Sequence, residues 1–359
     1  MTWLTIISAV FLILSSLSPF VSPVKIWFIA IFGLLYPYLF ILNFFLFLFF
    51  VSRKKLVLLV PLMALIISST HLPLTLQLDG SNGKPEDVSV EDEIKLVSFN
   101  VRVFDLYNWS RNIDTRERIF SYIENQKPNL LCLQEFYSSD KGDYNNLKLI
   151  LSRIEPKYKH VEYSTTLRET DHWGIATFSS YPIFNKGVIY FDEQRSNVCI
   201  FSDITIKDDT VRVYNSHLQS IRFDNDDYKF IESFVGEEEE PEKMIRTKAI
   251  VSRLKLAYIK RAKQAEMIAQ HIETSPYPVV ICGDFNDTPV SYSYRTISNE
   301  LTDAFKLSGM GIGSSYSGPI PGLRIDYILH SSSINSYDFE VDNQKLSDHY
   351  PITCKISFK

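Results

Sequence analysis

The sequence contains a set of polar residues whose chemistry suits the hydrolysis of a phosphate ester. Five short apolar runs end in such groups, and a sixth run carries one acid in its interior. Hydrolysis of a phosphodiester requires neutralised non-bridging oxygens, an activated water and assistance to the leaving oxygen. Carboxylate and amide oxygens bind Mg²⁺ or Mn²⁺, and imidazoles can donate protons to phosphate. The residues are Asn100, Glu135, His217, Asp284, Asn286, Asp326, Asp348 and His349.

Asp326 differs from the others because it lies inside an apolar run, residues 324–328. Burying a carboxylate is unfavourable unless a partner neutralises it or donates hydrogen bonds to it. The sequence therefore predicts a partner for Asp326 within the fold.

The elements that must position these groups are short strands and a few helices. Period-two and apolar runs predict strands at 94–100, 130–134, 158–163, 174–179, 198–206, 210–216, 278–282, 324–330 and 352–358. Helical patterns cover 115–125, 145–153 and 247–273. This mixture predicts an α/β or α+β domain, a sandwich of sheets flanked by helices. We expect the acidic segment 224–242 to be a solvated loop.

The order of the polar motifs resembles a known superfamily. The motifs are Ser98-Phe99-Asn100, Leu133-Gln134-Glu135, Asn215-Ser216-His217-Leu218, Gly283-Asp284-Phe285-Asn286-Asp287, Arg324-Ile325-Asp326 and Ser347-Asp348-His349. Together they resemble the endonuclease/exonuclease/phosphatase superfamily, which includes DNase I-like nucleases, neutral sphingomyelinases and inositol polyphosphate 5-phosphatases. The resemblance covers residues 94–358 and is to a membrane-anchored bacterial type. It implies a four-layer DNase I-like sandwich of two mixed β-sheets flanked by helices.

The resemblance also implies a metal site. Glu135 would bind the catalytic Mg²⁺ or Mn²⁺, and Asn100 and Asp348 would lie near the same ion. Their hard oxygen donors suit such a cation.

The remaining matched residues would act on the phosphate and the water. His349 would donate to the scissile phosphate, and Asp326 would orient this imidazole and favour its protonated form. Asp284 would position or deprotonate the attacking water, and Asn286 would hold that water or a phosphate oxygen. His217 would supply a second imidazole, as in the DNase and sphingomyelinase branches.

Two further residues are weaker candidates for substrate binding. His172 precedes the strand expected at 174–179, and Arg195 precedes the strand expected at 198–206. For both residues we favour the alternative, which is a surface or structural position for His172 and a solvated position for Arg195.

The charge of the part from residue 79 onward argues against a non-specific nucleic-acid binder. Only four of the 37 basic residues precede it, so 33 basic residues face 42 acidic ones, a formal charge of −9. Such binders usually have a basic surface.

The four cysteines lack the spacing of a metal site and are expected to be buried thiols, although a disulfide is an alternative. They are Cys132, Cys199, Cys282 and Cys354.

The first 78 residues contain no acidic residue and form three apolar stretches. Their lengths predict three transmembrane helices at about 4–21, 26–51 and 56–70. The domains expected are a membrane region at 1–78, a linker at 79–92 and the catalytic domain at 93–359. The alternative is a set of buried core helices; a cleaved signal peptide does not fit.

The basic cluster Arg53, Lys54 and Lys55 sets the expected topology. Such clusters remain on the cytoplasmic side. With three spans, the catalytic domain lies on the extracytoplasmic side, which is the periplasmic side of a bacterial inner membrane. With two spans, it lies in the cytoplasm.

These observations predict a membrane-anchored, divalent-metal-dependent phosphodiesterase of nuclease-like or sphingomyelinase-like type. Its partners would be a phosphodiester substrate, either nucleic acid or a phospholipid headgroup, and the bilayer; no protein partner is inferred. An inositol-phosphate phosphomonoesterase is less favoured because residues 281–287 and 322–326 depart from that group's motifs. A non-catalytic membrane receptor or scaffold is the alternative from a different class.

Overall fold

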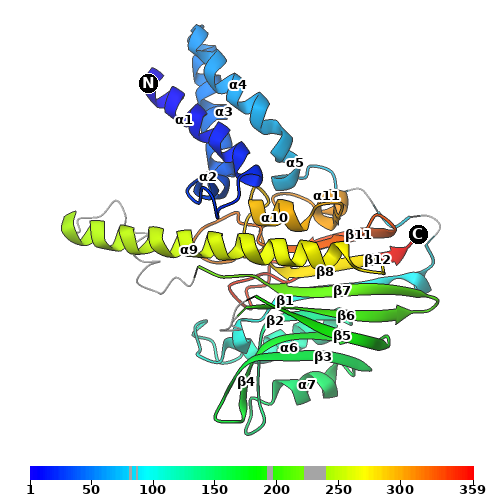
Figure 1. Cartoon of the computed structure of the whole chain (residues 1–359). Helices are drawn as coiled ribbons and strands as arrows, with labels where there is room; N and C mark the ends of the chain where they lie inside the picture. The colour runs from blue at the N-terminus through cyan, green and yellow to red at the C-terminus, as the bar shows by residue number, and fades with distance from the viewer. Residues whose placement is uncertain (81–82, 86–87, 192–196, 222–239) are drawn as a thin grey trace. The chain divides into compact units, whose positions relative to one another are not determined.

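The structure is a computed structural model that describes residues 1–80, 83–85, 88–191, 197–221 and 240–359 (Figure 1). It divides into two compact units that are not contiguous in sequence. Unit 1 comprises Met1–Leu76, Gln219–Glu266 and Asn286–Ile297. Unit 2 comprises Gln77–Leu218, Met267–Phe285 and Ser298–Lys359.

Unit 2 is built on two mixed sheets of six strands each. The first has the order β11-β12-β1-β2-β4-β3 and the second β5-β6-β7-β8-β10-β9. Each contains one parallel pair, β1 with β2 and β7 with β8, and the other pairs are antiparallel. The strands are β1 (Ile94–Asn100), β2 (Leu130–Ser139), β3 (Tyr158–Leu167), β4 (Asp171–Ser179), β5 (Ile183–Tyr190), β6 (Val198–Ile206), β7 (Asp209–His217), β8 (Val279–Asp284), β9 (Thr302–Asp303), β10 (Asp326–His330), β11 (Ile334–Val341) and β12 (Ile352–Phe358).

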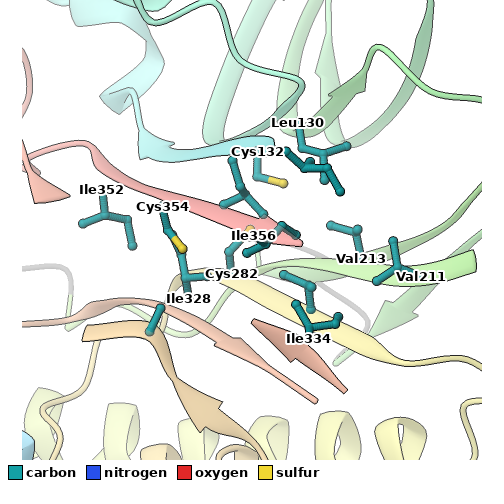
Figure 2. Close-up of a cluster of buried hydrophobic side chains, with 14 of the residues drawn as sticks. Leu130, Cys132, Val211, Val213, Cys282, Ile328, Ile334, Ile352, Cys354 and Ile356 are labelled. Atoms are coloured by element: carbon teal, nitrogen blue, oxygen red, sulfur yellow. The ribbon is translucent and has the colours of Figure 1, made fainter. Parts of the chain in front are cut away.

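Apolar side chains from both sheets form one core, shown in Figure 2. Leu130 and Cys132 of the first sheet lie in the same cluster as Val211, Val213 and Cys282 of the second. Burial of this apolar surface is the main force that holds the sheets together. All four cysteines are buried and free.

The first sheet is covered on its other face by helices. Along β1 and β2, alternate residues point to opposite faces, so Phe99 and Leu133 pack with the helical residues Ile119, Phe120 and Ile123 instead of the intersheet core. The helices of unit 2 include α6 (Thr115–Gln126), α7 (Asn146–Arg153) and α11 (Ala304–Ser308). Two mixed sheets flanked by helices confirm the predicted sandwich.

Buried amides link the two sheets near the functional strand ends. Gln134 Nε2 donates to Asn215 Oδ1 at 2.7 Å and to Ser98 Oγ at 3.2 Å. Asn215 Nδ2 donates to the carbonyl of Ala176 at 2.9 Å. The first of these bonds joins β2 to β7 and the last joins β7 to β4, so both connect the two sheets across a largely apolar interface.

Unit 1 contains the apolar N-terminal helices. They are α1 (Thr2–Leu17), α2 (Ile29–Leu34), α3 (Tyr36–Ser52), α4 (Leu59–Ser68) and α5 (Leu72–Thr75). Polar groups join α1, α3 and α4, as is common between helices in lipid. Asn43 Nδ2 donates to Ser8 Oγ at 2.9 Å, Ser16 Oγ to Ser68 Oγ at 2.8 Å, and the Tyr36 hydroxyl to the Ser68 carbonyl at 2.8 Å.

Two helical runs, Thr2–Phe20 and Leu56–Thr75, are long and apolar enough to cross a membrane by length and composition, which is weak evidence taken alone. The stretch expected at 26–51 is divided at Leu35, and its longer helix, Tyr36–Ser52, has 17 residues. In the third stretch, Pro61 lies in the first turn of α4, where proline is tolerated. The number of spans remains a prediction.

The apolar helices of unit 1 pack against later parts of the chain. Val290 belongs to the same apolar cluster as Leu12 and Tyr36. Gly33 approaches the Val290 carbonyl so closely that a Cβ atom there would lie 2.3 Å from its oxygen. Unit 1 also contains α10 (Tyr292–Ile297) and most of the long helix α9 (Glu240–Glu273). This helix begins before the expected residue 247, so residues 240–242 of the expected acidic loop are helical; residues 224–239 of that loop lie outside the described residues.

Candidate active site

Strand pairing brings the predicted site residues of unit 2 to one edge of the two sheets. Asn100 and Gln134 are partners in the parallel pair β1 and β2. In the second sheet, Asp284 is the partner of His217 on β7 and of Asp326 on β10. Asn100, His217 and Asp284 are the last residues of β1, β7 and β8. Asp326, expected inside a strand at 324–330, is instead the first residue of β10, and antiparallel pairing places it beside the end of β8.

Local backbone geometry sets the positions of the acids. Glu135 has φ 50° and lies in a register shift between Leu133 and Phe136, the kind of bulge that re-aims a side chain. Gly283 has φ 134°, and a Cβ atom there would lie 2.0 Å from the backbone oxygen of Ser216. The close approach of β7 and β8 beside Asp284 therefore requires glycine.

The carboxylate of Asp284 lies at the centre of the site. Its Oδ2 accepts a hydrogen bond from Asn100 Nδ2 at 3.0 Å and lies 3.6 Å from Nε2 of both His217 and His349. The same Asn100 amide donates to Glu135 Oε1 at 3.2 Å. Burial raises the pKa of Asp284 to about 6, against the opposing effect of the His349 charge.

Asp326 and His349 form a buried pair. The Asp326 Oδ2 and His349 Nδ1 atoms are 2.9 Å apart, and the side chains are 2% and 6% exposed. Burial alone would lower the pKa of His349, but the Asp326 and Asp284 carboxylates outweigh burial and raise it well above its ordinary value. Asp326 thus has the partner that its buried position requires.

The donor atoms fit a hard divalent cation. Burial and the Asp348 carboxylate raise the pKa of Glu135, so negative charge is concentrated there and a cation would relieve it. Asp284, Asp326 and His349 form a second group able to hold a metal ion, with donor atoms within 4.8 Å of one another. His349 Nδ1 already bonds Asp326, so the carboxylate-rich side at Glu135 suits Mg²⁺ or Mn²⁺ better.

Of the three expected metal ligands, two are in direct contact. Asn100 bonds Glu135 through its amide nitrogen, while its Oδ1 accepts from the Arg102 backbone N–H at 3.0 Å. Asp348 Oδ2 lies 3.3 Å from Nε of Arg102. In this arrangement Asn100 orients the carboxylates, and Asp348 is paired with a cation of the chain.

The weaker candidates are placed differently. The His172 ring nitrogens lie 3.0 Å from Thr166 Oγ1 on β3 and 3.1 Å from Oδ2 of Asp140, the residue that follows β2. Arg195 lies outside the described residues. Asn286 has φ 52° and belongs to unit 1, two residues after Asp284.

Two residues at the site were not predicted from the sequence. Arg102 pairs with Asp348, and its guanidinium carbon lies 4.6 Å from the centre of the Trp109 ring. Tyr316 pairs with His349 in an isolated bridge, with ring centres 5.8 Å apart. Arg102 could have been proposed from the sequence because it lies two residues after Asn100. No feature of the sequence pointed to Tyr316.

Comparison with known structures supports the same architecture. A Bacteroides vulgatus endonuclease/exonuclease/phosphatase has a TM-score of 0.55 at 16% identity, covering 74% of this chain and 99% of that chain. The human nocturnin catalytic domain with bound sulfate has a TM-score of 0.51 at 17% identity, covering 76% and 97%. Humanized D. rerio TDP2 has a TM-score of 0.51 at 15% identity, covering 74% and 99%. At these identities the similarity shows the fold.

Comparison at the level of sequence families covers both parts of the chain. No curated protein matches the chain. Residues 1–75 match a domain of unknown function (DUF8431). Residues 97–349, more than half of the chain, match the Endonuclease/Exonuclease/phosphatase family, whose members are typically phosphoesterase hydrolases. The chain therefore belongs to the endonuclease/exonuclease/phosphatase family.

Proposed function

We propose that this protein is a membrane-anchored, divalent-metal-dependent phosphodiesterase. The observation that carries the proposal is the position of Asp284 Oδ2, within 3.6 Å of two imidazoles and hydrogen-bonded to Asn100. A buried acid flanked by two proton donors is suited to the activation of water beside a phosphate.

Each residue of the site has a separate proposed role in hydrolysis. With a pKa of about 6, Asp284 is mostly ionised at neutral pH and can take a proton from the attacking water. His349, oriented by Asp326 through Nδ1, can donate from Nε2 to a phosphate oxygen. His217, whose Nε2 lies 3.6 Å from the same Asp284 oxygen, would donate to a second phosphate oxygen. A bound Mg²⁺ or Mn²⁺ would supply charge neutralisation.

Asn100, Glu135 and Asp348 are the residues that we propose hold the metal. Asn100 aligns Glu135 and Asp284 through one amide group. Arg102 would leave Asp348 when the cation binds and would then be available to the substrate phosphate, because a guanidinium matches phosphate oxygens well.

The internal order of the N-terminal helices supports the anchor. Ser16, Tyr36 and Ser68 are in contact at one position along the axis of the helix bundle. Asn43 and Ser8 are in contact at a second position, closer to the C-terminal end of α3. The basic turn that begins at Arg53 therefore lies at the end remote from Tyr36. Seventeen residues of helix separate the two, about 25 Å, close to the thickness of a hydrocarbon core.

The contacts of unit 1 also favour the three-span topology. The guanidinium carbon of Arg295 on α10 lies 4.2 Å from the centre of the Phe20 ring, at the end of the helices opposite the Arg53 turn. If the basic turn is cytoplasmic, α10 is extracytoplasmic. This is the arrangement expected for a catalytic domain on the periplasmic side.

The substrate class is a phosphodiester of nucleic acid or of a phospholipid headgroup. A membrane anchor would favour a lipid substrate by proximity. One structural neighbour, D. rerio TDP2, is known in complex with a single-strand DNA product. An assay of both substrate types distinguishes between them.

The test uses the full chain in detergent with Mg²⁺ or Mn²⁺ and four substrates: plasmid DNA, RNA, sphingomyelin and bis-p-nitrophenyl phosphate. Asp284→Asn and Glu135→Ala should each lose at least 100-fold in kcat. Glu124→Ala, which removes an exposed glutamate from α6, is the matched control and should retain activity. Full activity in Asp284→Asn would exclude the proposed mechanism.

A further inference from the structure

The long helix α9 carries a concentration of positive charge that the catalytic chemistry does not use. Residues 243–263 contain eight basic residues and no acidic residue, although the chain from residue 79 onward has a formal charge of −9. Arg261 is buried and lies 3.7 Å from Asp287, whereas Lys248 and Lys263 are exposed on the surface of the helix. Exposed lysines on one helix of an acidic protein suit an anionic partner.

Two contacts within unit 1 define which side of α9 faces the apolar helices. Lys255 Nζ lies 5.8 Å from the centre of the Trp27 ring, in the turn between α1 and α2. Glu266 accepts a hydrogen bond from the Tyr292 hydroxyl on α10 at 2.8 Å. Lys255 and Glu266 are eleven residues apart, about three helical turns, so they lie on one face. We call this side, residues 244–266, the bundle-facing side of α9.

The bundle-facing side continues toward the start of α9 as an exposed surface. Met244 lies three turns before Lys255 and is 58% exposed, and Lys248 lies between them and is also exposed. Ile245, Leu256 and Lys263 lie about 80–100° around the helix from Lys255, all to the same side of this line. Ile245 and Leu256 are 69% and 57% exposed, and Lys263 is also exposed. Large apolar side chains mixed with lysines are unfavourable in water but suit a membrane interface, where lysine stems remain apolar and the ammonium groups reach the headgroups.

We propose that the bundle-facing side of α9 binds the surface of an anionic phospholipid bilayer. Lys248, Lys255 and Lys263 would contact phosphate headgroups, while Met244 and Leu256 would enter the boundary of the acyl chains. This inference rests on the proposed function, because the apolar helices must be in the bilayer for this side of α9 to meet it. Lipid is favoured over a polynucleotide because the exposed apolar residues have no use in a phosphate-only contact.

The test measures the depth of α9 in a defined membrane. The full chain carrying Met244→Cys is labelled with an environment-sensitive fluorophore; the native cysteines are buried. It is reconstituted in nanodiscs of phosphatidylcholine, with or without about 30% phosphatidylglycerol, and quenched by headgroup nitroxide lipids. Quenching should be at least twofold stronger with the anionic lipid.

Charge variants show whether the lysines cause the effect. Lys248→Glu with Lys263→Glu should abolish the difference between the two lipid compositions. Lys127→Glu with Lys148→Glu makes the same change in charge at exposed positions of unit 2 and should leave the difference intact. Equal quenching in both lipid compositions would overturn the inference.

Two further outcomes separate the possible failures. If alkaline carbonate releases the full chain from membranes, the anchor itself is wrong, and with it this part of the proposed function. If the chain resists carbonate but a DNA oligonucleotide shields the label from an aqueous quencher better than anionic nanodiscs do, the anchor stands and the lipid-binding role of α9 is wrong.

Discussion

Replacement of Asp326 by asparagine should separate the charge of this residue from its shape. At 2.9 Å and an effective dielectric constant of about 20, the attraction between the Asp326 carboxylate and a protonated His349 is roughly 6 kcal/mol. A neutral asparagine amide would retain only the weaker charge–dipole attraction to the imidazolium. The barrier should therefore rise by about 3–5 kcal/mol, which corresponds to a fall of roughly 10²–10⁴ in kcat.

The assay is hydrolysis of bis-p-nitrophenyl phosphate with saturating Mg²⁺, together with a thermal melt. Asp303→Asn is the matched control, because Asp303 is a buried carboxylate 2.9 Å from Nη1 of Arg324 and is not one of the proposed catalytic residues. It should lower Tm but leave the kcat of the folded protein within about threefold. If Asp326→Asn lowers kcat no more than Asp303→Asn, the orienting role of Asp326 is refuted.

Three other changes test the structure more broadly. Gly283→Ala should destabilise the fold by about 3 kcal/mol or more, measured by urea denaturation, because its Cβ would meet the backbone of β7; an unchanged midpoint would contradict this geometry. Burial and the charge of Lys186 hold the pKa of His160 at about 4, so the unfolded chain binds the proton first as the pH falls. Stability should drop by roughly 3 kcal/mol from pH 6.5 to pH 4, and His160→Gln should remove that part of the pH dependence. Mg²⁺ at 100 times its Kd should stabilise the protein by about 2.7 kcal/mol, and the shift should disappear in Glu135→Gln; an equal shift in the variant would reject Glu135 as a ligand.

The central strands were predictable because their apolar patterns are strong. The ranges 94–100, 198–206 and 352–358 agree with β1, β6 and β12 at both ends. The missed strands β5, β9 and β11 all lie at sheet edges. An edge strand has fewer buried neighbours, so its sequence can carry polar residues, such as Asn185 and Asp338, that weaken the alternation.

The candidate site was predictable to the extent that its residues follow strands. A strand end shows in the sequence, and parallel pairing then brings several ends together. The partners of these residues were less visible, because the pairing of Arg102 with Asp348 joins positions 246 residues apart. In unit 1, the contact between Arg295 and Phe20 was equally hard to predict, because no repeating pattern in the sequence links these two positions.

The hydrogen bond between Gln134 and Asn215 fixes the alignment of one sheet relative to the other. Two apolar sheet faces can slip past one another with little loss of contact, whereas a buried amide pair permits one register only. A slip of one residue along a strand is about 3.3 Å, which exceeds the tolerance of every hydrogen bond at the strand ends. A buried polar bond of this kind fixes the alignment of an otherwise apolar interface. It therefore resists shear between the sheets at the place where the residues of the candidate site, which come from both sheets, lie together.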